Sequence, residues 1–320
     1  MTVLITGASG FIGSQLLTRI ASDDVVGLAR SKPSSFAAFP FFESEINGKS
    51  DYSKALNNVR VVIHLAARVH VMEDTSTNPL EDYREVNTYG TINLAKQAAR
   101  AGVKRFIFIS SIKSNGESSK RGKPFRYDDP LRPEDFYGQS KSEAEELLLQ
   151  VAHETGMEVV IIRPTLVYGP NVKANFASLL NLISKGIPLP FGCITDNRRS
   201  LVSVTNLVDL IVTCIDHPKA ANQVFLVSDD HDVSTSEMIH ELATALNKFK
   251  WQIPLPIWCY KLAGRIFSKS GVVDRLTGSL QVDITHTKET LGWIPPQTLE
   301  EGFKETASAF LESKKKRGKL

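Results

Sequence analysis

The chain has 320 residues, of which 42% are apolar and 23% charged, values typical of a globular domain protein. The net charge of +3 is too small to indicate nucleic-acid binding. No apolar run reaches the roughly 18 residues that a membrane span requires. Cys193, Cys214 and Cys259 lie far apart without metal-ligand spacing, so we expect no metal site and a reducing compartment. Because the first predicted strand begins at residue 2, we expect no signal peptide and a cytoplasmic location.

Short β-branched runs alternate with longer amphipathic stretches over the first two-thirds of the chain. The predicted strands are 2–6, 24–29, 59–67, 105–111 and 158–164. The predicted helices include 14–22, 83–102 and 138–156. This alternation predicts an α/β protein with a Rossmann-type doubly wound parallel sheet.

The regular alternation loosens after about residue 170, where prolines and glycines become frequent. We expect residues 1–170, completed by part of 200–230, to form a dinucleotide-binding domain, because ligands bind at the carboxyl edge of such sheets. Residues 171–320 are expected to form mainly a smaller mixed α/β substrate-binding lobe. The stretch 251–267 is the most lipid-like in the chain, but two prolines and two basic residues interrupt it, which predicts a buried or substrate-lobe segment.

Three glycines follow the first predicted strand in the sequence GASGFIG. Gly7 allows a tight turn, Gly10 lets the backbone approach a pyrophosphate, and Gly13 lets the next helix pack closely on the sheet. The backbone N–H groups near Phe11 and Ile12 then point at phosphate from a helix N-terminus. The spacing GxxGxxG between a strand and a helix therefore predicts a dinucleotide loop.

The end of the second predicted strand indicates which dinucleotide binds. An acidic residue at this point normally holds the ribose 2′-hydroxyl of NAD. Here Ala29 and Arg30 occupy the position, and a guanidinium can bind a 2′-phosphate in a bidentate manner. We expect NADP(H) to be favoured, with NAD(H) as the alternative.

A tyrosine and a lysine four residues apart form the second chemical signal. Tyr137 and Lys141 share one face of a predicted helix, and a neighbouring ammonium can lower the pKa of a phenol toward neutrality. The predicted strand 105–111 brings Ser110 and Ser111 to the carboxyl edge of the sheet. A serine hydroxyl there can bind the same substrate oxygen as the tyrosine, which predicts acid–base chemistry beside a nicotinamide.

Taken together, these motifs show that the chain resembles the extended short-chain dehydrogenase/reductase family, in its nucleotide-sugar epimerase, dehydratase and reductase branch. The motifs that carry the resemblance occur in the family's order over nearly the whole chain: GASGFIG (7–13), HLAA (64–67), VNTYGT (86–91), FISS (108–111), YGQSK (137–141), RPTLVYGP (163–170) and LGWIPP (291–296).

The resemblance implies a role for each matching residue. Tyr137 would be the acid and base, Lys141 would lower its pKa and bind the nicotinamide ribose, and Ser111 would hold the substrate oxygen. Further cofactor contacts would come from Leu65, Ala66, Ala67, Asn87, Pro164 and Thr165. The UDP-sugar would be bound by Lys113, Asn115, Asn175, Phe176, Arg199 and Arg275. Lys113 and Asn115 depart from the aromatic-bearing pattern of UDP-galactose epimerases. A homodimer is expected through helices at 81–101 and 137–154.

The motifs identify the family more specifically than they identify the reaction. The region after Ser111 reads IKSNGE, without the Asp-Glu pair of a 4,6-dehydratase. Because Ala29 and Arg30 favour NADPH as a consumed reductant, we expect a reductase of a UDP-linked 4-keto-6-deoxy amino sugar, giving a UDP-quinovosamine-type product in bacterial surface polysaccharide synthesis. The alternative is a UDP-glucose or UDP-GlcNAc 4-epimerase that uses the same three residues. A non-catalytic dinucleotide sensor is the remote alternative.

Overall fold

A seven-stranded parallel sheet forms the centre of the protein. The computed structural model describes residues 1–32, 39–69, 77–267, 270–316 and 318. The strand order is β3-β2-β1-β4-β5-β6-β9. The strands are β1 (Val3–Thr6), β2 (Val25–Ala29), β3 (Phe41–Glu43), β4 (Val61–His64), β5 (Arg105–Ile109), β6 (Glu158–Pro164) and β9 (Gln223–Val227). Because the chain extends the sheet first to one side of β1 and then to the other, a ligand crevice is expected outside the carboxyl ends of β1 and β4.

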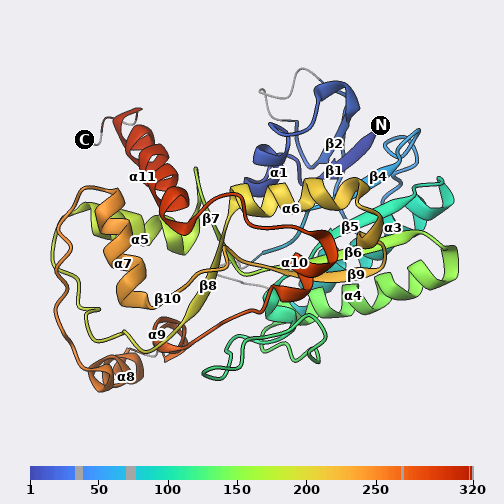
Figure 1. Cartoon of the computed structure of the whole chain (residues 1–320). Coiled ribbons are helices and arrows are strands. Elements are labelled where there is room, and N and C mark those ends of the chain that lie inside the picture. The colour runs from blue at the N-terminus through green and yellow to red at the C-terminus, as the bar shows by residue number, and fades with distance from the viewer. Residues whose placement is uncertain (33–38, 70–76, 268–269, 317, 319–320) are drawn as a thin grey trace.

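Helices cover both faces of this sheet, which confirms the predicted doubly wound α/β class (Figure 1). One face carries α1 (Phe11–Leu16) and α6 (Val204–Asp216), and α10 (Thr285–Leu291) packs beside β9. The other face carries α2 (Pro79–Arg84), α3 (Thr91–Arg100) and α4 (Phe136–Thr155). Alternate strand residues point to opposite faces, so Val3 and Ile5 join one core cluster while Leu4 joins the other.

Two predicted helices differ from the observed ones. The predicted helix 14–22 is the short α1, after which the N–H groups of Thr18 and Arg19 bond the carbonyls three residues back, so the chain leaves the α-helical pattern. The predicted helix 83–102 is divided by a π-helical segment, η2 (Glu85–Gly90), between α2 and α3. Such segments often occur at functional sites.

The second lobe is built around a three-stranded sheet in the order β10-β8-β7. Its strands are β7 (Leu166–Tyr168), β8 (Arg199–Ser203) and β10 (Asp232–Val233). Its helices are α5 (Ala174–Ser184), α7 (Thr235–Ala245), α8 (Ile257–Ile266), α9 (Ser270–Thr277) and α11 (Leu299–Lys316). Short turns of 3₁₀ helix lie at η1 (Ser22–Asp24), η3 (Ile112–Ser114) and η4 (Pro218–Ala220). The predicted limits of the two domains stay a prediction.

The aromatic core of the small lobe lies where α5, α7 and α11 meet β7. Tyr168, Phe176 and Phe303 contact one another, with Tyr168 and Phe176 stacked at 5.7 Å between ring centroids. All three side chains are buried. Because β7 follows β6 after a single residue, this core lies close to the end of the large sheet.

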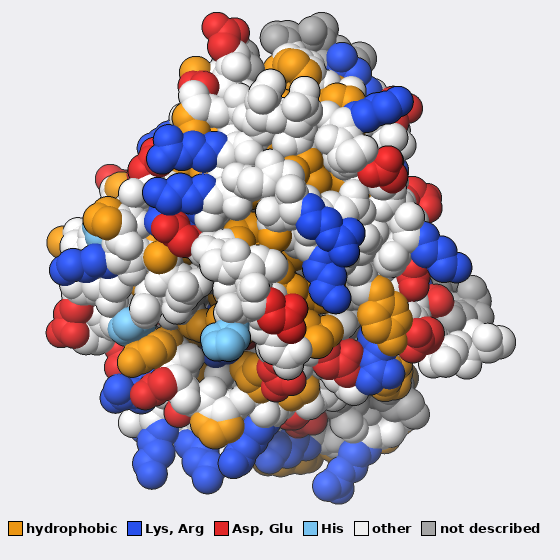
Figure 2. Space-filling model, turned by 90° about the vertical axis from the view of Figure 1, so that its right-hand side faces the viewer, with side chains coloured by type: hydrophobic (Ala, Val, Ile, Leu, Met, Phe, Trp, Pro, Cys, Tyr) orange, Lys and Arg blue, Asp and Glu red, His pale blue; other side chains and the backbone are white. Residues whose placement is uncertain are grey.

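Basic and acidic side chains are interspersed over most of the face of the molecule shown in Figure 2. Among the described residues, no helix is long and apolar enough to span a bilayer.

Candidate functional site

The glycine loop joins β1 to α1 at the carboxyl edge of the sheet. Gly7 has φ +68°, and a Cβ there would lie 2.8 Å from the backbone nitrogen of Ala66. A Cβ on Gly13 would lie 2.4 Å from the carbonyl oxygen of Gly7, and one on Gly10 would lie 3.0 Å from the same atom. Gly7 and Gly13 therefore need glycine, because a side chain at either position would displace backbone, and a side chain at Gly10 would be tight.

The first turn of α1 fits an anion. Gly10 is the N-cap and no side chain caps its N–H groups, and the first turn contains no acidic residue. Phe11 and Ile12 open the helix and pack their side chains against the core. The first N–H groups of a helix have no partner within the helix and are available to an anion. This is the cradle that a dinucleotide pyrophosphate requires, and the glycines and helix start present here fit that group.

The adenosine end of the expected site lies where β2 ends. Ala29 is buried in β2 and Arg30 is exposed immediately after it. Glu43, paired with Ala29 across the parallel strands, accepts a hydrogen bond from the Lys32 backbone N–H at 2.9 Å. No carboxylate stands at the end of β2 itself, as the sequence predicted.

The segment after β4 lies against the glycine loop. The Ala66 N–H donates to Thr6 Oγ1 at 3.3 Å, and Leu65 N–H donates to the Thr6 carbonyl at 3.3 Å. Leu65, Ala66 and Ala67 are only partly buried, so this stretch borders the crevice at the switch point. These contacts place the three residues beside Gly7, on the side where the resemblance expects the adenine and its ribose.

His64 ends β4 and is fully buried. Its Nδ1 contacts Thr6 Oγ1 at 2.6 Å and its Nε2 contacts Thr91 Oγ1 at 2.9 Å. Burial, and secondarily the charge of Lys141, lower the pKa of His64 to about 3. The imidazole is therefore neutral and serves as a structural bridge between β1, β4 and α3.

Asn87 braces the crevice from the π-helical segment η2. Its side chain accepts from the Arg68 N–H at 2.8 Å and donates to the Arg68 carbonyl at 3.0 Å and to Ser140 Oγ at 2.9 Å. Ser140 Oγ in turn donates to the Tyr137 carbonyl at 2.9 Å. One amide thus ties the segment after β4 to the first turn of α4, the turn that carries the tyrosine.

Tyr137 stands in the first turn of α4. Asp135 caps this helix by accepting from the Gly138 N–H at 2.6 Å, which fixes the entry of the chain. Burial raises the pKa of Tyr137 well above its usual range, the charge of Asp135 and the neighbouring Tyr83 add to this, and a hydrogen bond with Ser111 lowers it. The Ser111 side chain therefore neighbours the Tyr137 phenol, and the catalytic roles of both residues stay predictions.

Lys141 lies one turn further along α4 and is almost completely buried, with 1% of its surface exposed. Its Nζ donates to the Ile109 carbonyl at 2.8 Å and lies 4.3 Å from the centre of the Phe108 ring. Burial lowers the pKa of Lys141 to about 7, and the charge of Glu145 opposes that shift. The ammonium is held at the end of β5, beside the strand end that leads to Ser111.

A buried ion pair lies one more turn along α4, and the sequence prediction did not include it. Glu145 receives three contacts of 2.6–3.1 Å from the Arg163 guanidinium and a short hydrogen bond from Ser110 Oγ. Arg163 also donates to Asn115 Oδ1 at 3.0 Å. The spacing of Tyr137, Lys141 and Glu145 was the available signal, since positions four apart share a helix face.

The two residues that follow Ser111 on the predicted substrate side are engaged within the protein. Lys113 Nζ contacts Glu117 at 2.7 Å and Asp135 at 2.5 Å. Asn115 is buried, and its amide donates to the Asp129 carbonyl at 3.2 Å besides accepting from Arg163. Their main contacts thus support α4 and β6, and a sugar contact stays a prediction for both.

Pro164 and Thr165 end β6 at the same sheet edge. Thr165 is buried, and its Oγ1 donates to the Val227 carbonyl at 3.3 Å. Because the strands are parallel, the ends of β1, β4, β5 and β6 meet at one edge. Gly7, Ser111 and Pro164, far apart in the chain, therefore lie along one sheet edge, where a ligand is expected to bind.

The small lobe supplies the predicted sugar-diphosphate side. Phe176 is buried in the aromatic core of this lobe, and the side chain of Asn175 lies outside the described part of the chain. Arg199 Nη1 donates to the Arg275 carbonyl at 2.8 Å and to the Gly278 carbonyl at 3.3 Å. Burial, and then the like charge of Arg275, lower the pKa of Arg199, while the charge of Glu117 opposes the shift.

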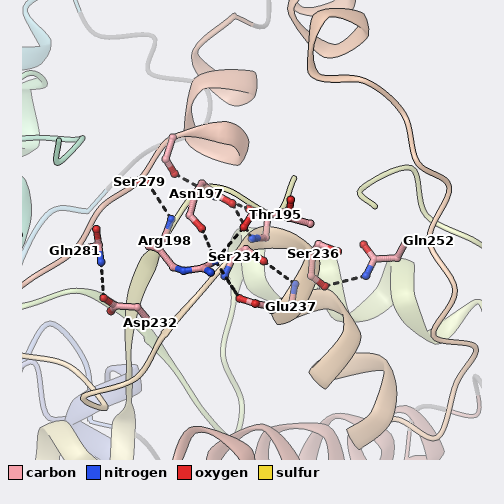
Figure 3. A network of polar contacts seen from close by, with 12 residues as sticks. Thr195, Asn197, Arg198, Asp232, Ser234, Ser236, Glu237, Gln252, Ser279 and Gln281 are labelled. Atoms are coloured by element: carbon pink, nitrogen blue, oxygen red, sulfur yellow. Dashed lines mark hydrogen bonds and ion pairs between the residues drawn. The ribbon is translucent and has the colours of Figure 1, made fainter. Parts of the chain in front are cut away.

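Polar contacts of the residues just before Arg199 join the start of β8 to the segment after α9, and Figure 3 shows those of Asn197, Arg198 and Ser279. Asn197 donates to Thr235 Oγ1 at 3.0 Å and to the Gly278 carbonyl at 3.2 Å. Ser279 Oγ accepts from the Arg198 N–H at 3.0 Å. The segment after α9 is thereby fastened to the start of β8, which fixes the approach of Arg275 to Arg199.

The fold and the site define a dinucleotide-binding protein with a Ser-Tyr-Lys group at the carboxyl edge of its sheet. Residues 3–228 match the family described as the NAD dependent epimerase/dehydratase family, and the chain belongs to this family. The resemblance to the extended short-chain dehydrogenase/reductases is confirmed.

Two relatives align over nearly the whole chain. A UDP-glucose 4-epimerase of Vibrio cholerae is 63% identical over 315 residues, covering 98% of this chain and 96% of the relative. An N-acetyl-alpha-D-glucosaminyl-diphospho-ditrans,octacis-undecaprenol 4-epimerase of Escherichia coli O157:H7 is 29% identical, covering 98% and 96%. The UDP-glucose 4-epimerase of Thermotoga maritima, solved with UDP-glucose, has the same fold with a TM-score of 0.77 at 24% identity, covering 98% and 99% of the two chains.

The comparisons correct the predicted reaction. The prediction of a 4-ketoreductase is wrong, because the full-length relative at 63% identity is a 4-epimerase, the reading that stood as the alternative. The physical reason is that Ala29 and Arg30 bear on the dinucleotide and do not determine the fate of the ketone. The same Ser111, Tyr137 and Lys141 would serve either reaction. The broader prediction, an enzyme that acts on a nucleotide sugar with an NAD(P)-type dinucleotide, agrees with the family match.

Proposed function

We propose that the protein is a 4-epimerase of a UDP-linked hexose. The observation that carries the proposal is the position of Tyr137 in the first turn of α4, one turn before Lys141, whose Nζ is held at the end of β5 next to Ser111, in a chain 63% identical to a UDP-glucose 4-epimerase. UDP-glucose and UDP-galactose are the first substrates to assay. UDP-GlcNAc and UDP-GalNAc are the second pair.

Tyr137 moves the proton in this proposal. Its phenolate oxygen takes the proton of the sugar C4 hydroxyl as C4 is oxidised, and the same phenol returns it to the C4 oxygen when C4 is reduced on its other face. When bound, the dinucleotide supplies the chemistry of accepting a hydride from C4 and giving it back. Because the proton and the hydride both return, the residues end the cycle in their starting states.

Ser111 and Lys141 make this proton transfer feasible. Burial raises the pKa of Tyr137, so an unassisted phenol would not ionise at neutral pH. The Ser111 hydrogen bond opposes that shift, and a positive charge on Lys141 stabilises a phenolate on the same helix face. Asn87 keeps the first turn of α4 in place while the charge changes.

The UDP portion is assigned to the second lobe. Arg199 and Arg275 present two guanidiniums, whose planar donors match the oxygens of a diphosphate. Bringing two like charges together is unfavourable until an anion lies between them, so this pair favours a diphosphate ligand over a neutral sugar.

We further propose that the dinucleotide site accepts a 2′-phosphate through Arg30, so that NADP restores activity to the dinucleotide-free protein. Arg30→Ala is expected to weaken NADP binding about tenfold and NAD binding little, because a charge-assisted bond to phosphate contributes roughly 1.5–3 kcal/mol. Equal effects on both dinucleotides would contradict this assignment. Solved neighbours with 21% and 20% identity were determined with NAD, so NAD is the reference ligand in the assay.

The test of the proposed reaction is interconversion of UDP-glucose and UDP-galactose by the full chain with Tyr137→Phe as the variant. Loss of general acid–base catalysis is expected to lower turnover about 10²–10⁴-fold. Tyr89→Phe is the matched control, since Tyr89 is 41% exposed on the neighbouring segment η2. Unchanged turnover in Tyr137→Phe would overturn the proposal, and a wild type that binds dinucleotide without turnover would favour the sensor alternative.

Three expectations stay predictions: a homodimer through the helices at 81–101 and 137–154, a cytoplasmic location, and a role in surface polysaccharide synthesis.

A further inference from the structure

Helix α8 has two apolar faces, and only one of them is buried. Tyr260 and Gly264 face the protein, and a Cβ on Gly264 would lie 2.7 Å from a methyl carbon of Val273 on α9. On the opposite side, Trp258, Leu262 and Ile266 are spaced four residues apart and are 65%, 51% and 67% exposed. A helix that packs on one side normally presents polar residues on the other, so this outward stripe requires an explanation.

The chain on both sides of this stripe is also apolar and exposed. Of the 16 large hydrophobic residues exposed in the described part of the chain, seven lie between positions 249 and 267. Besides the three on the helix, they are Phe249, Trp251, Ile253 and Phe267. Single exposed apolar residues are common on protein surfaces, but a concentration of this kind marks an interaction surface.

The charges beside the stripe have one sign. Residues 248–267 contain four basic residues and no acidic residue. Lys261 and Arg265 are exposed on α8, each within four positions of a stripe residue, and Lys248 and Lys250 precede the helix. The segment 248–267 therefore combines tryptophan and aliphatic side chains with cations and contains no carboxylate of its own.

Charge complementarity determines the partner. A second copy of this face would oppose cations to cations, which is unfavourable. A bilayer with anionic headgroups satisfies both parts, because apolar side chains enter the acyl boundary while Lys and Arg bind the headgroups. Tryptophan is also favoured at that boundary. We propose that α8 and the segment leading into it dock the protein on an anionic membrane surface, with the helix axis parallel to the bilayer.

The position of α8 gives this docking a geometric consequence. Figure 1 places α8 and α9 at the end of the small lobe, away from α3 and α4 on the large sheet. Helix α9, which packs on α8, carries Arg275 of the proposed diphosphate side. Docking would thus bring the substrate lobe to the membrane and leave the dinucleotide-binding sheet in water. The inference does not depend on which sugar the enzyme converts.

The chain carries its own reporter for this proposal. It has three tryptophans, of which Trp251 and Trp258 are 57% and 65% exposed on the proposed surface and Trp293 is buried. Full-length protein is titrated with vesicles of equal parts phosphatidylglycerol and phosphatidylcholine, and with pure phosphatidylcholine vesicles. We expect a blue shift of tryptophan emission and quenching by brominated acyl chains with the anionic vesicles only, weakening as salt is raised. Absence of the shift and of the quenching would overturn the proposal.

Variants locate the contact. Trp258→Ser with Leu262→Ser is expected to lower the vesicle association constant by at least about tenfold, since two large side chains no longer leave water. Lys261→Gln with Arg265→Gln is expected to lower it about fivefold per charge. Ile294→Ser, a control at a residue 71% exposed elsewhere, should leave it unchanged. UDP-sugar turnover without vesicles serves as the folding check for all variants.

Two outcomes would contradict the membrane assignment. Vesicle binding that survives Trp258→Ser with Leu262→Ser would place the contact on another surface. Concentration-dependent self-association that this double variant abolishes, measured by sedimentation velocity in the absence of lipid, would assign the stripe to a second copy of the chain.

Discussion

Replacing Glu145 by glutamine should destabilise the protein far more than the same change at Glu143, two residues earlier on α4. Glu145 and Arg163 form a bidentate pair whose side chains are 2% and 5% exposed. Removing one charge of such a pair leaves the other buried and unpaired, which costs about 3–5 kcal/mol. Glutamine keeps the volume and one acceptor oxygen, so we expect the lower end, about 3 kcal/mol.

Glu143 provides the matched comparison. It also contacts an arginine through two bonds, from Arg84 at 2.9 and 2.6 Å, but the two side chains are 27% and 29% exposed. Partly exposed pairs contribute about 0–1 kcal/mol. Urea unfolding followed by circular dichroism gives both values for the full-length variants. Losses of equal size in Glu145→Gln and Glu143→Gln would refute the reasoning that burial, and not contact geometry, sets the contribution.

Three further predictions concern the site. Burial lowers the pKa of Lys141 to about 7 from 10.5, so between these values the unfolded chain binds more protons. Between about pH 7 and 10.5, the unfolding free energy of the dinucleotide-free protein should therefore rise relative to that of Lys141→Met, by up to about 1.4 kcal/mol per pH unit. A difference between the two proteins that does not change with pH would contradict this prediction. Arg275→Gln should raise KM for the UDP-sugar about tenfold or more with kcat little changed, as loss of a charge-assisted bond requires, while Arg198→Gln should leave both constants unchanged. Gly13→Ala should abolish dinucleotide binding, measured by fluorescence titration, because its Cβ would lie 2.4 Å from the Gly7 carbonyl; full binding by this variant would show that the loop can rearrange.

The large sheet was predictable because each of its features is local in sequence. The β-branched runs at 2–6 and 105–111 contain β1 and β5, and GASGFIG joins β1 to α1, its last three residues forming the start of the helix. The reaction was not predictable in the same way. Ser111, Tyr137 and Lys141 suit any member that oxidises or reduces a sugar carbon, and Arg30 bears on the dinucleotide alone.

The features that the sequence did not reveal depend on tertiary placement. Glu145 and Arg163 are 18 residues apart on a helix and a strand, so their pairing becomes visible only when α4 packs on β6. In the stretch 251–267, Tyr260 and Trp258 are both apolar at helical spacing, and the sequence does not say which of the two faces packs inward. The prediction allowed a buried segment, but the structure exposes Trp258, because α9 covers only the side of Tyr260 and Gly264.

In the proposed reaction, the enzyme returns the same hydrogen to C4 of a UDP-hexose that was removed from it. UDP-glucose carrying deuterium at C4 is incubated with the full-length protein and dinucleotide in less than one-tenth of the substrate amount, and the products are followed by NMR and mass spectrometry. We expect UDP-galactose that keeps its deuterium at C4, with no net change in reduced dinucleotide. Two results would contradict the proposed epimerase reaction. One is that neither UDP-galactose forms from UDP-glucose nor UDP-GalNAc from UDP-GlcNAc. The other is transfer of the deuterium to released dinucleotide.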